Sequence, residues 1–532
     1  MKTMLQKLMI LVLMVSGINA MAQQTTFPGA PYKPMDSPVY GADVLIQGNP
    51  SEDQRNARIV VAQNGFLYSA YMISSGGFRI ARSTDNGASW VHSATLRGGY
   101  SLNAIDIAVT GADSNSINIW AISTGYKNSS IDVWDVVIEK FDNQMNVLSL
   151  TTLDQRLANF GYPDVAIATD FAYPSVGASP FSIGALYCKM GTPNDNIVFK
   201  SSADGGATYS NTQTLVSTGL AHMNVALAFG RSPSYPQGRY FAAWDKQEFF
   251  GGGYFGQVLT AYSLNQFDGA WSAPYSLDTI AGGNANSAMD PSIACQSDQV
   301  DNVNGAFTVV VTYDKLLPGG SKCAYGAGNL NPVAGDTWTP VFSSGTGTRH
   351  DFEPDIAYDG SHQKFYVTWS DSLNAKLKCA VNDMNLQTSG AWNSFSDGYN
   401  DAANISFPFP KVKFNPVSQQ VVHVWDSHRT TMICNATFDK NNLPVGISNA
   451  TTPERFSFSV SPNPCKSQTN ISFNLDREGN VSLLMFDLSG RQVLTIPSQL
   501  FSLGSHRYEL NTGTLKPGCY IVQLQAGNAF GI

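Results

Sequence analysis

Short apolar runs separated by polar turns recur through most of the chain. Seven copies of one unit can be aligned, each an apolar strand, a turn, and a second strand that ends near an aromatic residue. The centre of the first strand is alanine in six copies and Lys413 in the seventh. The copies are IVVAQNGFLYSAY (59–71), IDIAVTGADSNSINIW (105–120), PDVAIATD to GALY (163–187), NVALAFG to YFAAWD (224–245), PSIACQ to VVVTYD (291–314), PDIAYDGSHQKFYVTWS (354–370) and PKVKFNPVSQQVVHVWD (410–426). A period of about 58 residues with several β-branched strands per unit predicts the four-stranded blades of a β-propeller, about seven in number.

A single blade cannot bury both faces of its sheet, so the predicted blades must stack around a common axis. The last copy lacks an outer strand, because the residues after Phe438 turn polar and contain proline. The segment ADVLIQ (42–47) precedes the first copy. We expect it to supply the missing strand and close the ring.

Two turns share the pattern Ser-x-Asp-x-Gly-x-Ser/Thr-aromatic, STDNGASW (83–90) and SADGGATY (202–209). Asp and Ser side chains can hydrogen-bond the amides of a tight turn, the glycine permits a positive φ, and the aromatic residue packs the turn onto its sheet. The pattern therefore shapes the backbone and performs no chemistry. It resembles the Asp-box (BNR) repeats of sialidase-type propellers, which lie at the periphery of that fold, away from the active site. The matching residues are Ser83, Asp85, Gly87, Ser89, Trp90, Ser202, Asp204, Gly206, Thr208 and Tyr209, where Tyr209 replaces Trp.

The pattern changes after a link near residues 449–454. FSVSPNP (458–464), ISFNL (471–475), VSLLMFDLSGRQV (481–493) and LKPGCYIVQLQ (515–525) alternate apolar and polar residues between turns. This predicts a small β-sandwich. The segment resembles the type A sorting domain of the type IX secretion system, which implies passage through the periplasm and contact with that secretion machinery. It departs from that family at its end, AGNAFGI, where the family usually continues into a strand with basic residues.

The N-terminus predicts export. Lys2 and Lys7 precede an apolar run, and AMA (20–22) supplies small residues for cleavage. The predicted domains are a signal peptide (1–22), a propeller (23–452) and a sorting domain (453–532). No later stretch is apolar for long enough to span a membrane. The net charge of −8 argues against nucleic acid as the main partner. We therefore expect a secreted or surface-attached all-β protein.

Cysteines and metal ligands add little chemistry. The seven cysteines are odd in number and lack a close C-x-x-C pair, and Cys323, Cys379 and Cys434 follow their repeats by similar distances. We interpret these three as small apolar residues in equivalent strands. Asp298, Asp301, Asn302 and Asn304 miss the spacing of a calcium loop, and we expect neither a metal nor a cofactor. His423 and His428 fit a structural role.

The resemblance to sialidases implies an arginine cluster, an acid/base Asp, and a Tyr activated by a Glu. Arg58-Ile59 resembles the start of that family's Arg-Ile-Pro element, but Val60 stands where proline belongs. Residues 58–84, where the family places its acid/base residue, contain no Asp or Glu. General acid catalysis needs a positioned proton donor, so the standard sialidase mechanism is not expected. Arg239 and Arg349 fit surface ion pairs equally well.

The segments at which the repeats begin offer a different set of candidates, because they converge on one mouth of a propeller channel. They are GYPD (161–164), AHMN (221–224), AMDP (288–291), RHDFEPD (349–355) and SFPFP (406–410). The candidate ligand-binding residues are Tyr162, Asp164, His222, Asp290, Arg349, His350, Glu353 and Asp355, and Asp351 and Phe409 lie in the same segments. Carboxylates drawn together there could act as acid and base, since like charges raise one pKa. Alternatively, each proline stands where no ladder N–H is needed and each acid caps a turn.

The sequence thus predicts a ligand-binding propeller, with a glycan as the favoured ligand by analogy with the family. Two alternatives stay open. One is an exo-acting, sialidase-like or other glycoside hydrolase that uses the carboxylates at the mouth. The other is an adhesin or scaffold that binds a surface protein through the propeller.

Overall fold

The computed structural model describes residues 33–34, 40, 42–47, 52–111, 114–127, 133–157, 161–170, 182–191, 194–210, 212–218, 221–232, 235–250, 253–264, 270–277, 287–296, 308–317, 322–329, 333, 338–344, 351–360, 364–383, 392–394, 398–400, 409–427, 434–441, 458–463, 465–475, 479–487, 492–502, 504–513, 515, 520–526 and 529–531. The chain forms two compact units, Met1–Gly446 and Ile447–Ile532. The predicted signal peptide (1–22) lies outside the described residues. The part of the chain that the structure describes contains no helix with the length and apolarity of a membrane span.

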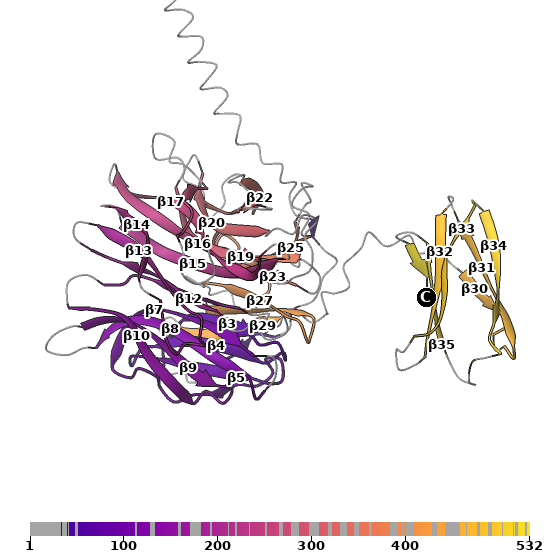
Figure 1. Ribbon diagram of the computed structural model, residues 1–532, viewed down its shortest axis with the longest axis horizontal. Coiled ribbons are helices and arrows are strands. Elements are labelled where there is room, and N and C mark those ends of the chain that lie inside the picture. Colours follow the sequence, from indigo (N-terminus) through magenta and orange to yellow (C-terminus); the bar gives the residue numbers. More distant parts are fainter. Residues whose placement is uncertain are drawn as a thin grey trace, which may run out of the picture. The chain divides into compact units, whose positions relative to one another are not determined.

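The described strands of the first unit form seven sheets, which are antiparallel apart from the short strand β1, Lys33–Pro34 (Figure 1). The first sheet contains β3 (Gln54–Val61), β4 (Leu67–Ile73), β5 (Phe78–Ser83) and β6 (Val91–His92). The second contains β7 (Tyr100–Thr110), β8 (Asn118–Lys127), β9 (Val133–Asp142) and β10 (Val147–Leu157). The third contains β11 (Val165–Thr169), β12 (Ile183–Lys189), β13 (Asp195–Ser202) and β14 (Gln213–Thr218). The fourth contains β15 (Ala221–Ser232), β16 (Tyr235–Phe250), β17 (Gly253–Tyr262) and β18 (Tyr275–Ser276).

The remaining three sheets repeat this order. The fifth contains β19 (Ala288–Cys295), β20 (Val309–Leu316), β21 (Lys322–Asn329) and β22 (Thr339–Ser343). The sixth contains β23 (Asp351–Asp359), β24 (Lys364–Asp371), β25 (Lys376–Asp383) and β26 (Asn393–Ser394), and β1 (Lys33–Pro34) extends it in parallel. The seventh contains β27 (Lys411–Asn415), β28 (Gln420–Ser427), β29 (Asn435–Lys440) and β2 (Val44–Leu45).

The sheets form a closed ring. Each innermost strand contacts the innermost strand of the next sheet, and β27 and β28 contact β3. The predicted β-propeller is therefore confirmed. The closing strand is also confirmed, because Val44 pairs with Phe438 and Leu45 with Thr437. The parallel strand β1 was not predicted.

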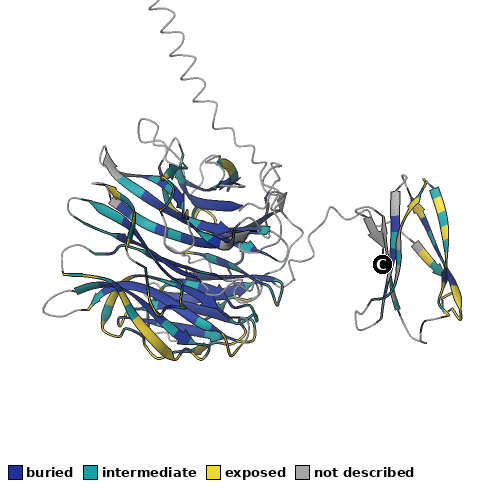
Figure 2. Ribbon diagram, in the orientation of Figure 1, coloured by how far each residue is buried: buried dark blue, intermediate teal, exposed yellow. Residues whose placement is uncertain are grey.

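The core of the propeller lies between neighbouring sheets. Seven clusters of buried apolar residues each combine side chains of two adjacent sheets, and the last joins the seventh sheet to the first. The second strands contribute the largest fully buried side chains, among them Trp120, Trp244, Trp369 and Trp425. Figure 2 shows that the inner strands are mostly buried and that outer strands such as β10 are largely exposed. Burial of each such side chain contributes roughly 1.5–3 kcal/mol, so the recurring aromatic residue is what holds the sheets together.

The two Asp-box turns, 83–90 and 202–209, follow the third strands β5 and β13. Asp85 Oδ1 accepts hydrogen bonds from the Ser83 hydroxyl (2.7 Å) and the Ser89 amide (2.9 Å), and Oδ2 accepts one from the Ser89 hydroxyl (2.5 Å). Asp204 accepts the same three bonds from Ser202 and Thr208. Gly87 and Gly206 have φ of 88° and 85°. The turns are backbone devices, as the pattern predicts.

The cysteines behave as apolar residues. Cys323 lies in β21, Cys379 in β25 and Cys434 directly before β29, which are the third strands of successive sheets. All three are free thiols with exposures of 1% or less. His423 is also buried and stacks on Tyr399 at 4.1 Å, whereas His428 lies outside the described residues.

The second unit consists of two sheets. One contains β30 (Phe458–Ser461), β31 (Gln468–Leu475) and β34 (Gly504–Asn511), and the other β32 (Gly479–Asp487), β33 (Gln492–Phe501), β35 (Tyr520–Ala526) and β36 (Ala529–Gly531). Ile471 and Leu510 of the first sheet share one core with Val481 and Leu483 of the second. This is the predicted β-sandwich.

Candidate functional site

Three cavities follow one another along the channel of the propeller. The mouth pocket, about 550 Å³, lies where the innermost strands begin. A narrower waist of about 140 Å³ follows, and a base pocket of about 590 Å³ lies where the same strands end. Alanine, valine and isoleucine side chains dominate the base pocket, whereas polar and charged groups line the mouth and the waist. The wider of these two polar cavities is the mouth pocket.

Each of the seven innermost strands, or the residues just before it, contributes to the lining of the mouth pocket, and Met72 of β4, Asp426 of β28 and Cys434 complete it. The residues from the innermost strands are Arg55, Asn56, Arg58, Asn103, Ala104, Pro163, Asp164, Asn224, Val225, Asp290, Pro291, Glu353, Pro354, Phe409 and Lys411.

Four non-glycine residues of the mouth pocket have a left-handed backbone. The φ angles are 58° at Asn56, 55° at Asp290, 55° at Glu353 and 42° at Phe409. The first three lie at shifts of register, where the innermost strand bulges away from its partner strand. Such backbone is unfavourable by about 1–3 kcal/mol per residue and persists only where surrounding contacts enforce it. The strain directs four side chains of different chemistry towards one pocket.

Each strained residue donates its backbone N–H to a carboxylate of the preceding sheet. Asp426 accepts hydrogen bonds from the amides of Asn56 (2.7 Å) and Ala57 (3.1 Å). Asp245 accepts the amide of Asp290 at 3.2 Å. Asp314 accepts the amide of Glu353 at 2.6 Å.

Glu353 in turn accepts the amide of Phe409 at 2.9 Å. Phe409 itself is 43% exposed, and its ring is part of the pocket wall. The chain of carboxylates and amides therefore links the bulges of successive sheets and fixes the position of an exposed aromatic ring.

The carboxyl groups at the mouth hold protons more tightly than usual. Burial raises the pKa of Glu353 to about 7, the Phe409 amide opposes this effect, and the charge of Asp290 adds to it. Burial and the neighbouring Asp245 raise the pKa of Asp290 to about 6. Burial also raises the pKa of Asp164 to about 6, against the hydrogen bond from the Val225 amide. The mouth thus contains carboxyl groups that titrate close to neutral pH.

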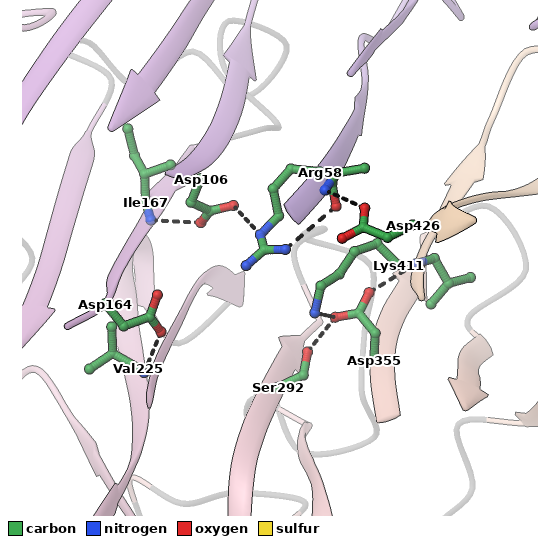
Figure 3. A network of polar contacts seen from close by, with 11 residues as sticks. Arg58, Asp106, Asp164, Ile167, Val225, Ser292, Asp355, Lys411 and Asp426 are labelled. Atoms are coloured by element: carbon green, nitrogen blue, oxygen red, sulfur yellow. Dashed lines mark hydrogen bonds and ion pairs between the residues drawn. The ribbon is translucent and has the colours of Figure 1, made fainter. Parts of the chain in front are cut away.

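Arg58 stands in the waist just below these groups. Figure 3 shows its guanidinium between Asp106 and Asp426. Its contacts are long, with Nε 4.0 Å from Asp106 Oδ1 and one terminal nitrogen 3.5 Å from the Ala57 carbonyl. Arg58 therefore contributes positive charge to the mouth, and its ion pair with Asp106 is long.

Asp355 and Lys411 close the other side of the waist. Asp355 accepts the Ser292 hydroxyl at 2.7 Å and the Val412 amide at 2.9 Å, and the Lys411 ammonium lies 3.5 Å away. Burial alone would raise the pKa of Asp355, but the charges of Lys411 and Lys413 outweigh it and lower that pKa. Asp355 joins three sheets and has a structural role.

Three predicted ligand-binding residues lie together at the mouth, namely Asp164, Asp290 and Glu353. Asp355 lies deeper, in the waist. Tyr162 and His222 have 0% exposure and do not line the mouth pocket, so their assignment as ligand-binding residues is corrected. Tyr162 packs against Tyr187 between two sheets, and burial lowers the pKa of His222 to about 4. The prediction for Arg349 and His350 falls outside the described residues.

Other residues of the site were not predicted. Asn56, Asn224, Arg58 and Lys411 line the mouth pocket, and Asp245, Asp314 and Asp426 hold its bulges. A signal for these three aspartates exists in the repeats, because each follows the aromatic residue at the end of a second strand, in WD, YD and WD.

Metal ligands do not cluster within the described ranges, where no group of three or more His, Cys, Asp or Glu could hold an ion. The segment with Asp298, Asp301, Asn302 and Asn304 lies outside those ranges.

Comparison with protein families gives one match, since residues 459–531 match the secretion system C-terminal sorting domain. Comparison with curated protein sequences gives no match. Similar solved structures include the α-L-arabinanase of Penicillium chrysogenum, at 15% identity and TM-score 0.43 over 66% of this chain and 99% of the enzyme. They also include the lectin BP39L of Burkholderia pseudomallei, at 10% identity and TM-score 0.45 over 70% of this chain and 93% of the lectin.

The sialidase of Trypanosoma rangeli is a further similar structure, at 7% identity and TM-score 0.36 over 93% of this chain and 88% of the sialidase. All three TM-scores lie below 0.5, so the chemistry of the mouth is inferred from this chain's own residues. The family match confirms the predicted sorting domain, which indicates a secreted or surface-attached protein. The chain is thus a β-propeller followed in sequence by the C-terminal sorting domain of a secretion system.

Proposed function

We propose that the mouth pocket binds a glycan. The observation that carries this proposal is the convergence of four strained residues on one cavity. A non-glycine residue at positive φ is unfavourable, so Asp290, Glu353 and Phe409 fit positions at which the side chain itself is needed. Aspartate tolerates this backbone better than most residues, but the side chains of Glu353 and Phe409 do nothing to relieve the strain.

The chemistry of the wall suits a sugar. An exposed aromatic ring such as Phe409 can pack against the C–H face of a pyranose, because that face is apolar. Amides at Asn56, Asn103 and Asn224 and the charged groups around them can donate and accept hydrogen bonds with hydroxyl groups. The size of the pocket, about 550 Å³, falls in the range of small-ligand sites. A mono- or disaccharide end would fit this combination.

The strain also favours binding by preorganisation. The bulges are fixed by hydrogen bonds from neighbouring sheets before any ligand arrives. Binding then needs little ordering of the wall, which lowers the entropic cost of association.

A glycan array with the full-length protein tests the proposal, followed by calorimetry on the glycans that bind. Phe409→Ala should weaken binding at least tenfold, since it removes the stacking surface. Val417→Ala is the matched control, because Val417 is 61% exposed but does not line the mouth pocket. An array without binding, or equal affinity of the Phe409→Ala variant, would contradict the proposal. Binding to a surface protein alone would instead support the adhesin alternative.

A further inference from the structure

Asp290 and Glu353 hold the same structural position on adjacent sheets. Each lies near the start of an innermost strand, β19 or β23, at a φ of 55° within a shift of register. Each has its amide held by an aspartate at the end of the second strand of the preceding sheet. Both side chains line the mouth pocket beside Phe409. Two carboxyl groups on neighbouring sheets therefore face one cavity.

The two carboxyl groups have different surroundings. Asp290 is exposed to the pocket, and its Oδ1 accepts a hydrogen bond from the Asn224 amide at 2.5 Å. Glu353 is less exposed and accepts a hydrogen bond from the backbone of Phe409. Hydrogen bonds from N–H donors stabilise the charged form of both, but burial favours the neutral form of Glu353 more strongly.

Other charged groups face the pair from several strands. Asp245, Asp164, Lys322 and Lys411 act on Asp290, and Lys411, Asp426 and Asp290 act on Glu353. Near neutral pH the group with a pKa of about 6, Asp290, is largely ionised, while Glu353, with a pKa of about 7, still carries its proton in much of the protein. A proton donor and a proton acceptor then stand in the same pocket.

We propose that Glu353 and Asp290 hydrolyse a glycosidic bond of the bound glycan, with Glu353 as general acid and Asp290 as general base. This proposal rests on the proposed glycan binding and adds a reaction to it. The Glu353 carboxyl gives its proton to the glycosidic oxygen as the bond from that oxygen to the anomeric carbon breaks, and the bonding electrons leave with the oxygen. A water molecule bonds to the anomeric carbon and gives a proton to Asp290. The products are a free sugar and an alcohol, and both protons are accounted for.

The roles of Glu353 and Asp290 can be tested separately with substrates whose leaving groups differ in their need for a proton. Glu353→Gln should slow the hydrolysis of the bound glycan itself 10²- to 10⁴-fold, because its alcohol leaving group has to be protonated. It should slow 2,4-dinitrophenyl glycosides of the same sugar far less, because dinitrophenolate leaves without a proton. Asp290→Asn should slow both classes, since attack by water is impaired in each. A merely structural effect of Glu353→Gln would lower both classes equally and would overturn the acid role.

The pH profile is a second readout. The wild type should show a bell with limbs near the two pKa values, the acid limb from Asp290 and the alkaline limb from Glu353. Glu353→Gln should lose the alkaline limb. Glu139→Gln is the matched control, because burial raises the pKa of Glu139 to about 7 as well but this residue does not line the pocket. It should leave turnover and both limbs unchanged.

The experiment uses the full-length protein, with the glycans that bind in the array and their aryl glycosides as substrates. Binding by Asp290→Asn and Glu353→Gln with loss of turnover supports the proposal and shows that the variants fold. Glycan binding by the wild type without turnover of any bound glycan overturns the proposal but leaves glycan binding intact. Absence of glycan binding refutes the proposed function instead.

Discussion

The Asp-box turns and the mouth pocket are both built around aspartate or glutamate, but their pKa values move in opposite directions. Partial burial would raise the pKa of Asp85, but hydrogen bonds from Ser89 and Ser83 outweigh it and lower that pKa to about 2. The hydroxyl and amide of Thr208 lower the pKa of Asp204 to about 2 as well. At the mouth, burial raises the pKa of Asp290 to about 6 and of Glu353 to about 7.

The difference shows that the surroundings of a carboxyl group decide whether its charged or its neutral form is stabilised. In the turns, donors surround a carboxylate that solvent also reaches, so its charge is stabilised. At the mouth, carboxylates accept hydrogen bonds from strained backbone amides, and Asp164, Asp290 and Glu353 line one pocket. Ionisation therefore stabilises the fold at the turns and destabilises it at the mouth.

Among the changes considered, Gly87→Ala in the first Asp-box turn should lower the free energy of unfolding most. A methyl group at this position would lie 2.0 Å from Phe438 Cε1 of the seventh sheet, at a φ of +88°. We expect a loss of about 3 kcal/mol in the free energy of unfolding from overpacking and backbone strain. Gly99→Ala is the control, because its φ is +79° but nothing lies within 4 Å. It should lose only about 1 kcal/mol.

Tryptophan fluorescence in urea can measure both variants, since all nine Trp residues precede residue 447 and report on the first unit. Equal losses for the two variants would show that the contact with Phe438 contributes nothing.

Glu139→Gln tests the effect of burial alone, because Glu139 has a raised pKa but does not line the mouth pocket. Glu139 is 4% exposed, its Oε2 has no hydrogen-bond partner among the described residues, and burial raises its pKa to about 7. Because the folded protein binds this proton more tightly than the unfolded chain, the contribution of Glu139 is complete below about pH 4.5 and is lost as pH rises through 7. The variant should therefore be more stable than wild type at pH 8 by roughly 2 kcal/mol, with the difference vanishing near pH 4.5. Urea unfolding at both pH values measures it, and a variant less stable at pH 8 would disprove the expectation.

Asp85→Asn should lower the free energy of unfolding, whereas Glu139→Gln should raise it. The amide cannot accept both hydroxyl hydrogen bonds and the backbone bond that Asp85 accepts, so a loss of about 1 kcal/mol is expected at pH 7. Because the pKa of Asp85 is lowered in the fold, its contribution is present above about pH 3.8 and disappears as pH falls through 2. Thermal unfolding of both proteins between pH 2 and 7 should show the curves converging in acid. A constant difference over that range would mean that ionisation plays no part.

Glu353→Gln should give the smallest change in stability, a gain of about 1 kcal/mol at pH 8 that vanishes below about pH 4.5. The gain is smaller than that of Glu139→Gln because solvent reaches the mouth and screens the charge. The same unfolding assay applies. A loss of stability at pH 8 would show that the hydrogen bond to the Phe409 amide outweighs the burial of charge.

The fold could be predicted in detail because the same order of apolar strand, turn and aromatic-ended strand recurs along the chain. The small residues of most innermost strands and the aromatic residue in each second strand recur for a physical reason, since they fill the space between adjacent sheets. The closing strand was found from what the seventh copy lacks. By contrast, β1 is only two residues long and carries no repeat signal.

The site was only partly predictable. Asp290 and Glu353 were found because carboxylates stand out beside proline at the start of a repeat. Tyr162 and His222 occupy similar places in the sequence but point into the core, since side chains on a strand alternate between its faces and a bulge changes that alternation. The bulges occur at Asn56, Asp290 and Glu353, and none of them is marked by a glycine.

The pairing of Val44 with Phe438 has a consequence for how this protein matures. The strand that completes the seventh sheet is synthesised early, and the strands it joins are synthesised last within the first unit. The ring cannot close until almost the whole first unit has been made, and contacts between such distant positions form slowly. Completion of the propeller therefore has to wait for the synthesis of residues up to Phe438.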